Sequence, residues 1–146
     1  HTIVCGKPRE AKGKIVSYLK KDERTNTAKI VPQTTNGAKR AELDYEVLEY
    51  NSETDHSLVR VKLYSGRGHQ IRVQMQSIKC PVFGDQKYGG EKMPKLMLNL
   101  FASELSFSHP VTKQKLIFRV YPPETADAWK EFNIEKHLSL RTNMND

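Results

Sequence analysis

The chain has 146 residues, enough for one domain with a hydrophobic core. Its 24 lysine and arginine residues outnumber 17 aspartate and glutamate residues, which gives a formal net charge of +7. This charge suits a polyanion such as RNA, although many basic proteins bind no nucleic acid. The sequence has neither a long apolar run that could span a membrane nor the pattern of a secretory signal peptide.

The cysteines and histidines form no metal-binding pattern. Cys5 and Cys80 lie far apart in apolar surroundings and lack CxxC spacing, so we interpret them as reduced core thiols of a cytosolic protein. We therefore expect a cytoplasmic location. The five histidines are scattered along the chain, and we expect no metal site.

The first half of the chain predicts short strands joined by polar turns. The expected strands are residues 3–5, 12–19, 28–31, 39–50 and 57–64, and the expected turns are residues 6–8, 20–24, 34–37 and 51–55. The apolar positions of residues 39–50 alternate as far as Val47 and then shift by one, to Leu48 and Tyr50. This shift predicts a β-bulge after Val47.

The hydrophobic period changes near residue 65. Residues 57–64 alternate between apolar and charged side chains, as in a half-buried strand, and Ser65 and Gly66 end that pattern. Ile71, Met75 and Ile78 then follow the spacing of one helix face. A strand is therefore expected to enter a tight glycine turn that opens a helix.

The second half predicts a hairpin and a short helix. Residues 79–85 are expected to be extended, with a turn at Gly84, and residues 96–101 are apolar enough for either a helix or a strand. A hairpin is expected over residues 103–121, with its apolar side chains facing inward: Leu105, Phe107, Leu116, Phe118 and Val120. Thr125 is a candidate N-cap for a short helix that carries Ala128, Trp129 and Phe132.

About seven strands and two helices with mostly hairpin connections indicate an α+β fold. We expect a mixed, mainly antiparallel β-sheet with a few helices on one face. The sequence contains no internal repeat, and residues 133–146 form a polar tail.

The glycine turn concentrates the candidate functional residues, Arg67, His69, Gln70 and Arg72. Such a cluster is often only a solvated helix start. Arginines near a helix N-terminus oppose the macrodipole, however, which indicates an anionic partner or a buried carboxylate. Arg72 follows Ile71 one turn into the helix, so we expect it to be partly buried and to need a carboxylate or phosphate partner.

The sequence gives little support for a serine hydrolase, a nucleotide-binding enzyme or a cysteine nucleophile. The sequence has no Gly-x-Ser-x-Gly elbow and no glycine-rich phosphate loop of Walker or Rossmann type. Cys80 and His69 could form a thiol–imidazole pair, but the apolar context of Cys80 before a proline favours a structural role. Asp85 follows Gly84, and we expect it to ion-pair or to cap a turn.

Several blocks resemble the RluA family of pseudouridine synthases. Residues 63–73, LYSGRGHQIRV, resemble the family block L-x-T-G-R-T-H-Q-I-R-V-H, and residues 80–89, CPVFGDQKYG, resemble H-P-I-x-G-D-x-x-Y-G. Residues 98–110 resemble L-x-L-H-A-x-x-L-x-F-x-H-P, and residues 3–8 and 41–48 are similar to two strands of the family. The resemblance covers nearly the whole chain in the family's order.

The resemblance implies a pseudouridine synthase-like catalytic domain that isomerises uridine in structured RNA without a cofactor or metal. The base is detached at C1′, turned and rejoined through C5 while an essential aspartate in an H-R-L-D block acts on the flipped-out uridine. Arg72 matches the arginine that ion-pairs with this aspartate, and Ile71 matches the aliphatic residue under the uracil. Arg67, His69 and Gln70 match positions that hold the turn, and Arg67 is also a candidate RNA contact. The resemblance implies that these three residues and Ile71 bind the substrate.

The chain departs from the family pattern because it contains neither the H-R-L-D block nor the family's stacking tyrosine, and it begins on a strand at His1. We therefore expect residues 1–132 to be the C-terminal portion of a catalytic domain that is inactive alone, followed by the tail. The expected partner is ribosomal or transfer RNA, with no membrane and no metal, and the full-length protein is expected to be a monomer.

Two alternatives remain open from the sequence. The chain could be a non-catalytic RNA-binding domain of the same fold, or a basic structural domain of an RNA–protein assembly. The latter would bind RNA without regard to sequence and with a strong salt dependence.

Overall fold

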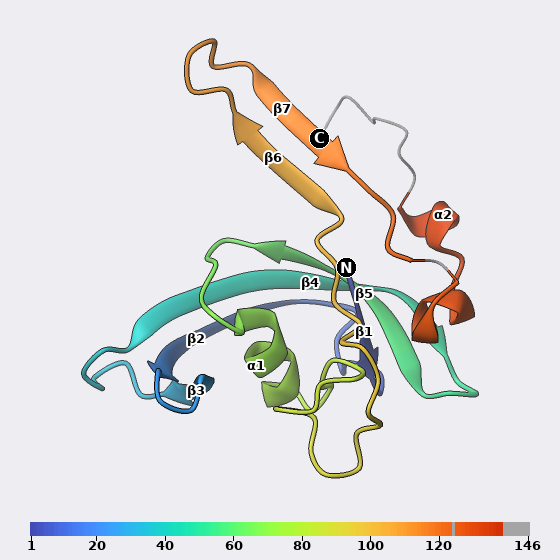
Figure 1. Cartoon of the computed structure of the whole chain (residues 1–146), viewed down its shortest axis with the longest axis horizontal. Coiled ribbons are helices and arrows are strands. Elements are labelled where there is room, and N and C mark those ends of the chain that lie inside the picture. Colours follow the sequence, from blue (N-terminus) through green and yellow to red (C-terminus); the bar gives the residue numbers. More distant parts are fainter. Residues whose placement is uncertain (124, 139–146) are drawn as a thin grey trace.

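The main body of the molecule is a five-stranded sheet, seen in a computed structural model that describes residues 1–123 and 125–138. The strand order is β1-β5-β4-β2-β3, and every neighbouring pair is antiparallel (Figure 1). The strands are β1 (Thr2–Cys5), β2 (Lys12–Asp22), β3 (Thr27–Val31), β4 (Lys39–Asn51) and β5 (His56–Leu63). All five strands predicted for the first half of the chain are present.

Two details of the sheet test the sequence prediction directly. The register between β4 and β5 shifts between Val47 and Glu49, which confirms the predicted bulge. The charged turn expected at residues 20–24 begins later than predicted, because Lys20, Lys21 and Asp22 still pair with β3. Backbone pairing thus extends the hairpin through charged residues whose side chains are exposed.

The two faces of the sheet differ as the alternation predicts. Ala41 and Leu43 of β4 are fully buried. The acidic residues between and after them lie on the other face, where Glu42 pairs with Lys14 at 2.9 Å and Glu46 pairs with Arg60. Burial of one face fixes the register, since a slip of one residue would expose every core side chain.

Helix α1 (Gln70–Ser77) packs on the apolar face of the sheet (Figure 1). Met75 is fully buried, and Ile71 and Ile78 pack partly buried against the same core cluster, which confirms the predicted helix face. The chain then runs from residue 78 to residue 103 without a regular strand or helix. The 96–101 segment is extended beside β1, where the Ile3 amide donates to the Asn99 carbonyl at 3.0 Å.

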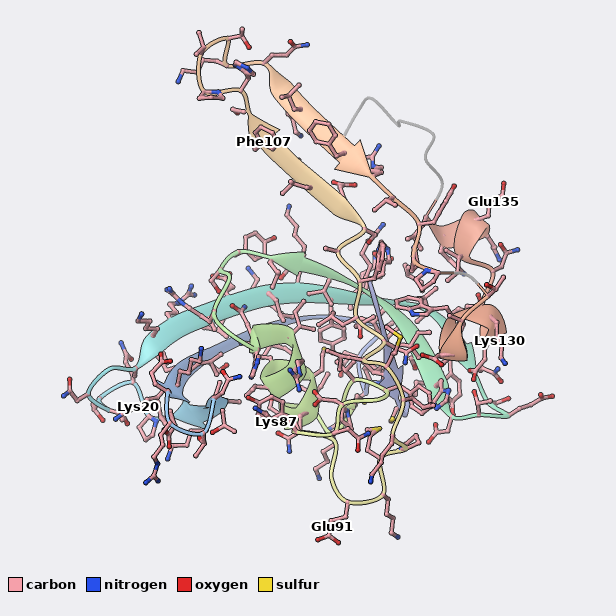
Figure 2. The ribbon with its side chains drawn as sticks, in the orientation of Figure 1. Lys20, Lys87, Glu91, Phe107, Lys130 and Glu135 are labelled. Atoms are coloured by element: carbon pink, nitrogen blue, oxygen red, sulfur yellow. The ribbon has the colours of Figure 1, made fainter. Side chains whose placement is uncertain are left out.

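Strands β6 (Glu104–Ser108) and β7 (Lys115–Arg119) form a separate hairpin that projects away from the main sheet (Figure 1). The hairpin itself matches the prediction, but the inward orientation predicted for its apolar residues is wrong for this chain. Leu105 and Phe118 are cross-strand partners on one face, yet they are 62% and 57% exposed. Figure 2 shows Phe107 on this hairpin, well away from the core. Within the described residues, nothing covers this face.

The C-terminal segment returns to the sheet. It forms the 3-10 helix η1 (Asp127–Glu131) and the short helix α2 (Ile134–His137). Ala126, and not Thr125, is the N-cap of η1, so the predicted cap is wrong. The expected core residues of this segment, Ala128, Trp129 and Phe132, are indeed buried.

The predicted polar tail begins inside the packed part of the chain. Ile134 and Leu138 are 2% and 8% exposed and pack with Trp129, so the first residues after the predicted boundary at 133 belong to the core. Residues 139–146 of that tail lie outside the described residues. None of the described helices has the length and apolar character needed to cross a membrane.

Candidate active site

The glycine turn between β5 and α1 is fastened to the sheet by Gln70. This side chain is only 3% exposed. Its Oε1 accepts from Ser65 Oγ at 2.8 Å and from the Arg67 amide at 3.1 Å, while its Nε2 donates to the Glu42 carbonyl at 3.1 Å. Gln70 therefore holds the turn from inside the fold. Its expected contact with substrate stays a prediction.

His69 supports the start of α1 from the other side. Its backbone is left-handed, with φ of 58°, and its Nδ1 lies 2.7 Å from the Tyr88 hydroxyl oxygen. That oxygen also accepts a hydrogen bond from the Ala28 amide at 2.8 Å. Burial lowers the pKa of His69, and the positive charges of Arg72 and Lys87 lower it further. A neutral imidazole that accepts from the Tyr88 hydroxyl fits this arrangement.

Arg72 binds Asp85 through two parallel hydrogen bonds. Its Nε donates to Oδ2 at 2.9 Å and its Nη2 donates to Oδ1 at 2.8 Å. The sequence offered no evident acid for Arg72, and its expected partner was an aspartate absent from the chain. The structure adds a partner within the chain, because Asp85 binds Arg72, while the expected pairing with a catalytic aspartate stays a prediction.

Asp85 also caps the turn that follows it. Its side chain is fully buried, and its Oδ1 accepts from the amides of Lys87 and Tyr88, both at 3.1 Å. Both structural roles expected of Asp85, ion pairing and turn capping, are therefore present. The turn itself depends on Gly84, because its φ is +84° and a Cβ there would lie 2.2 Å from the Met97 carbonyl oxygen.

The Arg72–Asp85 pair stays charged inside the fold. Burial acts to raise the pKa of Asp85, but the hydrogen bonds from Arg72 and from the amides of Tyr88 and Lys87 outweigh it and leave this pKa below its usual value. The hydrogen bond to Asp85 in turn raises the pKa of Arg72. The guanidinium also lies 5.0 Å from the centre of the Tyr88 ring, which favours the cation.

One edge of the Arg72 guanidinium remains available. The side chain is 18% exposed, and Asp85 engages Nε and Nη2. Nη1 has no hydrogen-bond partner within residues 1–123 and 125–138. A guanidinium carries five N–H donors in a planar fork, so a second anionic group can bind at this edge. Asp85 thus fixes the orientation of Arg72, and the Nη1 edge of the guanidinium can bind a second carboxylate.

The remaining predicted site residues lie on either side of this arginine. Ile71 is half-buried against the core cluster below α1. Arg67 is exposed, and its Nε donates to the Arg40 carbonyl at 3.0 Å. The structure therefore gathers His69 and Arg72 around Tyr88 and Asp85, whereas Arg67 points to the edge of the sheet near the start of β4.

Sequence reasoning left Tyr88 and Asp85 out of the candidate site. Both stand in the block at residues 80–89, each next to a glycine, and this position was a usable signal. Their contacts with His69 and Arg72 join residues 13 and 19 positions apart, which no local period reveals.

The thiols do not take part in this site. Both cysteines are free, and Cys80 is buried. Burial raises the pKa of Cys5 to about 11 and also raises that of Cys80, so both are poor nucleophiles at neutral pH. The His69 ring bonds to Tyr88, as described above. In the part of the chain that the structure describes, no group of three or more His, Cys, Asp or Glu residues could hold a metal ion.

Comparison with known proteins identifies the family. Residues 2–77 match the sequence profile described as RNA pseudouridylate synthase. This chain belongs to the RNA pseudouridylate synthase family. The resemblance to its RluA group is confirmed, because the relatives include ribosomal large subunit pseudouridine synthase D and tRNA pseudouridine synthase C. The α+β, mainly antiparallel fold is confirmed as well.

Among the relatives of this chain is ribosomal large subunit pseudouridine synthase D of Vibrio cholerae. The two sequences are 32% identical, and the match covers 81% of this chain and 38% of that protein. tRNA pseudouridine synthase C of Vibrio vulnificus is 32% identical over 63% of the chain and 39% of that protein. The solved structure of human RNA pseudouridylate synthase domain containing 1 superposes with a TM-score of 0.67 and 26% identity, over 88% of this chain and 55% of that one.

The chain spans less than half the length of the curated relatives that it matches. The family match lies in the N-terminal half of the chain and does not extend over residues 1–132. The prediction that residues 1–132 are the C-terminal portion of a catalytic domain is therefore wrong in part, because the family match lies within residues 2–77. The domain limits themselves stay a prediction.

Proposed function

We propose that this chain forms part of an enzyme that isomerises uridine to pseudouridine in ribosomal or transfer RNA. The observation that carries the proposal is Arg72, which stands at the family's arginine position, is held by buried Asp85 and keeps one edge free. Relatives named as synthases for both RNA classes support it. They do not favour the alternative of a non-catalytic RNA-binding domain.

In this proposal, the free edge of Arg72 binds the carboxylate of the catalytic aspartate. An adjacent guanidinium lowers the pKa of a carboxylate and fixes its direction, so the aspartate would be ionised and aimed at the flipped-out uridine. These 146 residues contain no H-R-L-D block. The catalytic aspartate would therefore have to come from outside these 146 residues, and we expect the chain alone to be inactive.

Ile71 and the glycine turn would position the base. Ile71 precedes Arg72 and is half-buried on the core, so its side chain is a fixed apolar surface next to the arginine. Uracil could lie on this surface while the C1′–N1 bond breaks and a C1′–C5 bond forms, with C5 losing its proton and N1 gaining one. Gln70 and His69 would act on the base only by holding this turn in place.

We further propose that the protein acts as a monomer in the cytoplasm and uses no metal or cofactor. The two free thiols suit a reducing compartment. The net charge of +7 suits an RNA partner.

The test is direct detection of pseudouridine. The complete gene product and the 146-residue chain would each be incubated with ribosomal and transfer RNA lacking modifications, and the nucleosides analysed by mass spectrometry after chemical labelling of pseudouridine. We expect product from the complete gene product and none from the chain alone. Absence of product with both RNA classes, in a protein that binds them, would overturn the proposed activity.

A further inference from the structure

A basic groove lies at the edge of the sheet beside the glycine turn. It has a volume of about 320 Å³ and is formed by parts of β2, β3, the start of β4 and the turn before α1. Its lining residues with charged side chains are Lys21, Glu23, Lys39 and Arg67. Gly66 and Gly68 form the wall nearest to α1, which leads on to Arg72.

Arg67 is fixed in the groove before any ligand arrives. Its amide donates to Gln70 Oε1 and its Nε donates to the Arg40 carbonyl, so both its backbone and its side chain are anchored. These bonds leave both terminal nitrogens of the guanidinium available. Rotamer entropy that is lost on folding need not be lost again on binding, which makes a fixed arginine a better anion ligand than a mobile one.

The lysines supply further positive charge. Lys21 lies across the turn, since its Nζ is 3.9 Å from where a Cβ on Gly68 would stand. It has one carboxylate neighbour, Glu23, at 3.8 Å, and that side chain is 85% exposed. Lys39, at the start of β4, also lines the groove. The groove thus holds three positive charges against one weakly placed negative charge.

This excess contrasts with the paired arginines and lysine of strands β2, β4 and β5. On the charged face of the sheet, Lys14 and Arg60 each pair with a carboxylate of β4, and Arg40 beside the groove pairs with Glu42. Arg67 and Lys39 have no carboxylate within 4.0 Å in the described part of the chain. Neighbouring cations repel one another, so a cluster of three cations with one exposed carboxylate is suited to an external anion.

We propose that this groove binds phosphodiester groups of the RNA strand next to the target uridine. Arg67 would hold one phosphate through its terminal nitrogens, and Lys21 and Lys39 would neutralise the adjacent one. The two glycines let the strand approach the backbone closely on its way toward Arg72. This inference rests on the proposed function, because it places the substrate of that reaction.

The test measures RNA binding by the 146-residue chain as a function of salt. Arg67→Ala and Lys39→Ala would be compared with wild type, using a labelled single-stranded RNA of mixed sequence. Each phosphate contact contributes a slope of about −0.7 in log affinity against log salt for single strands. We expect each variant to reduce the slope by about that amount and to weaken binding about fivefold at about 0.1 M salt.

Two matched controls separate this site from general charge effects. Lys113→Ala lies in the turn of the projecting hairpin, and Arg9→Ala precedes the far end of β2. We expect both to change affinity by less than about twofold. Arg67→Gln, which can still donate to the Arg40 carbonyl, should weaken binding like Arg67→Ala while leaving thermal unfolding unchanged. Equal effects in groove and control variants would overturn the proposal.

Inorganic phosphate distinguishes RNA from a small anion as the ligand. If free phosphate binds wild type but not Arg67→Ala, and RNA affinity is the same in both, the groove is a small-anion site and the proposal is wrong. Failure of the proposed function is a different result. The complete gene product would then make no pseudouridine although its RNA binding still depends on Arg67.

Discussion

Arg72 and Asp85 form a two-point ion pair in which the carboxylate is fully buried and the guanidinium keeps one edge open. A buried carboxylate without a partner would be strongly unfavourable, so Asp85 must stay bound to Arg72. The pair therefore holds both the loop after Gly84 and the arginine side chain in place. The same contact therefore stabilises the fold and aims the residue on which the proposed chemistry depends.

Asp85→Asn should destabilise the chain by about 3 kcal/mol, because it leaves the Arg72 charge without its carboxylate and weakens the cap of the following turn. Urea unfolding followed by circular dichroism measures the change. A double-mutant cycle with Arg72→Gln gives the coupling between the two residues. Coupling below about 0.5 kcal/mol, as for an exposed surface pair, would contradict the buried role.

Tyr88→Phe should cost about 2 kcal/mol, because it removes the acceptor for the buried Ala28 amide and the contact with His69. Tyr64→Phe is the matched control: its hydroxyl donates to Asp44 at 2.5 Å, but its side chain is 49% exposed. We expect the control to cost less than about 0.5 kcal/mol. Equal losses of stability in the two variants would show that the hydrogen bonds of the Tyr88 hydroxyl contribute no more than those of an exposed tyrosine.

The titrations of His69 and Asp85 should each lower stability as the pH falls, in two separate steps. The pKa of folded His69 lies below its ordinary value of 6.5, so the unfolded chain takes up the proton first and stability begins to fall as the pH drops below that value. The pKa of Asp85 lies below its ordinary 3.8, so its contribution is lost as the pH falls from that value through the folded pKa. Urea midpoints measured across this range follow both steps.

His69→Asn tests the assignment of the first step. Asparagine tolerates the left-handed backbone at this position but does not titrate, so the variant should lose the step near neutral pH and keep the acid one. An unchanged first step would assign it to a different group.

Gly84→Ala and Gly90→Ala separate backbone strain from steric overlap. Both glycines have positive φ, +84° and +86°, but a Cβ on Gly90 would meet nothing within 4 Å. We expect a cost of about 1 kcal/mol for Gly90→Ala and more than about 3 kcal/mol for Gly84→Ala, where the Met97 carbonyl must move. Thermal unfolding of the two variants measures this difference. Similar melting temperatures would contradict the tight packing at Gly84.

Loss of an aromatic ring should reduce stability much more in the C-terminal helices than in the projecting hairpin. Trp129 is 3% exposed and Phe118 is 57% exposed. Trp129→Ala should cost about 4 kcal/mol through the cavity that it leaves, whereas Phe118→Ala should cost less than about 0.5 kcal/mol. A large loss for Phe118→Ala in the 146-residue chain would mean that this face is covered in solution.

Local patterns are sufficient to predict most of the sheet. The alternation along β4, the phase shift after Val47 and the helical spacing of Ile71 and Met75 each depend on neighbouring residues, and each matches the structure. The hairpin at β6 and β7 is predictable for the same reason. Alternation does not indicate whether the apolar face of this hairpin packs on the core, because that depends on where the hairpin lies in the fold. The predicted inward orientation of this face is therefore wrong.

The candidate site is only partly predictable. Arg72 can be singled out because a guanidinium among apolar neighbours needs a partner, but the identity of that partner depends on how the loop after α1 folds back. Asp85 and Tyr88 reach the site because Gly84 turns the chain there. The prediction for the tail fails for a related reason, since Ile134 and Leu138 are isolated apolar residues in a polar stretch and become core only through contact with β1 and β5.

The most direct test of this account is Arg72→Lys in the complete gene product, with single-turnover pseudouridine formation and RNA affinity measured together. Lysine keeps the charge but lacks the planar fork, so it cannot bind Asp85 at two points and orient a second carboxylate. We predict a rate lower by about 100-fold or more with RNA affinity within about twofold of wild type. An unchanged rate, or a rate that falls only in proportion to affinity, would contradict the role assigned to Arg72.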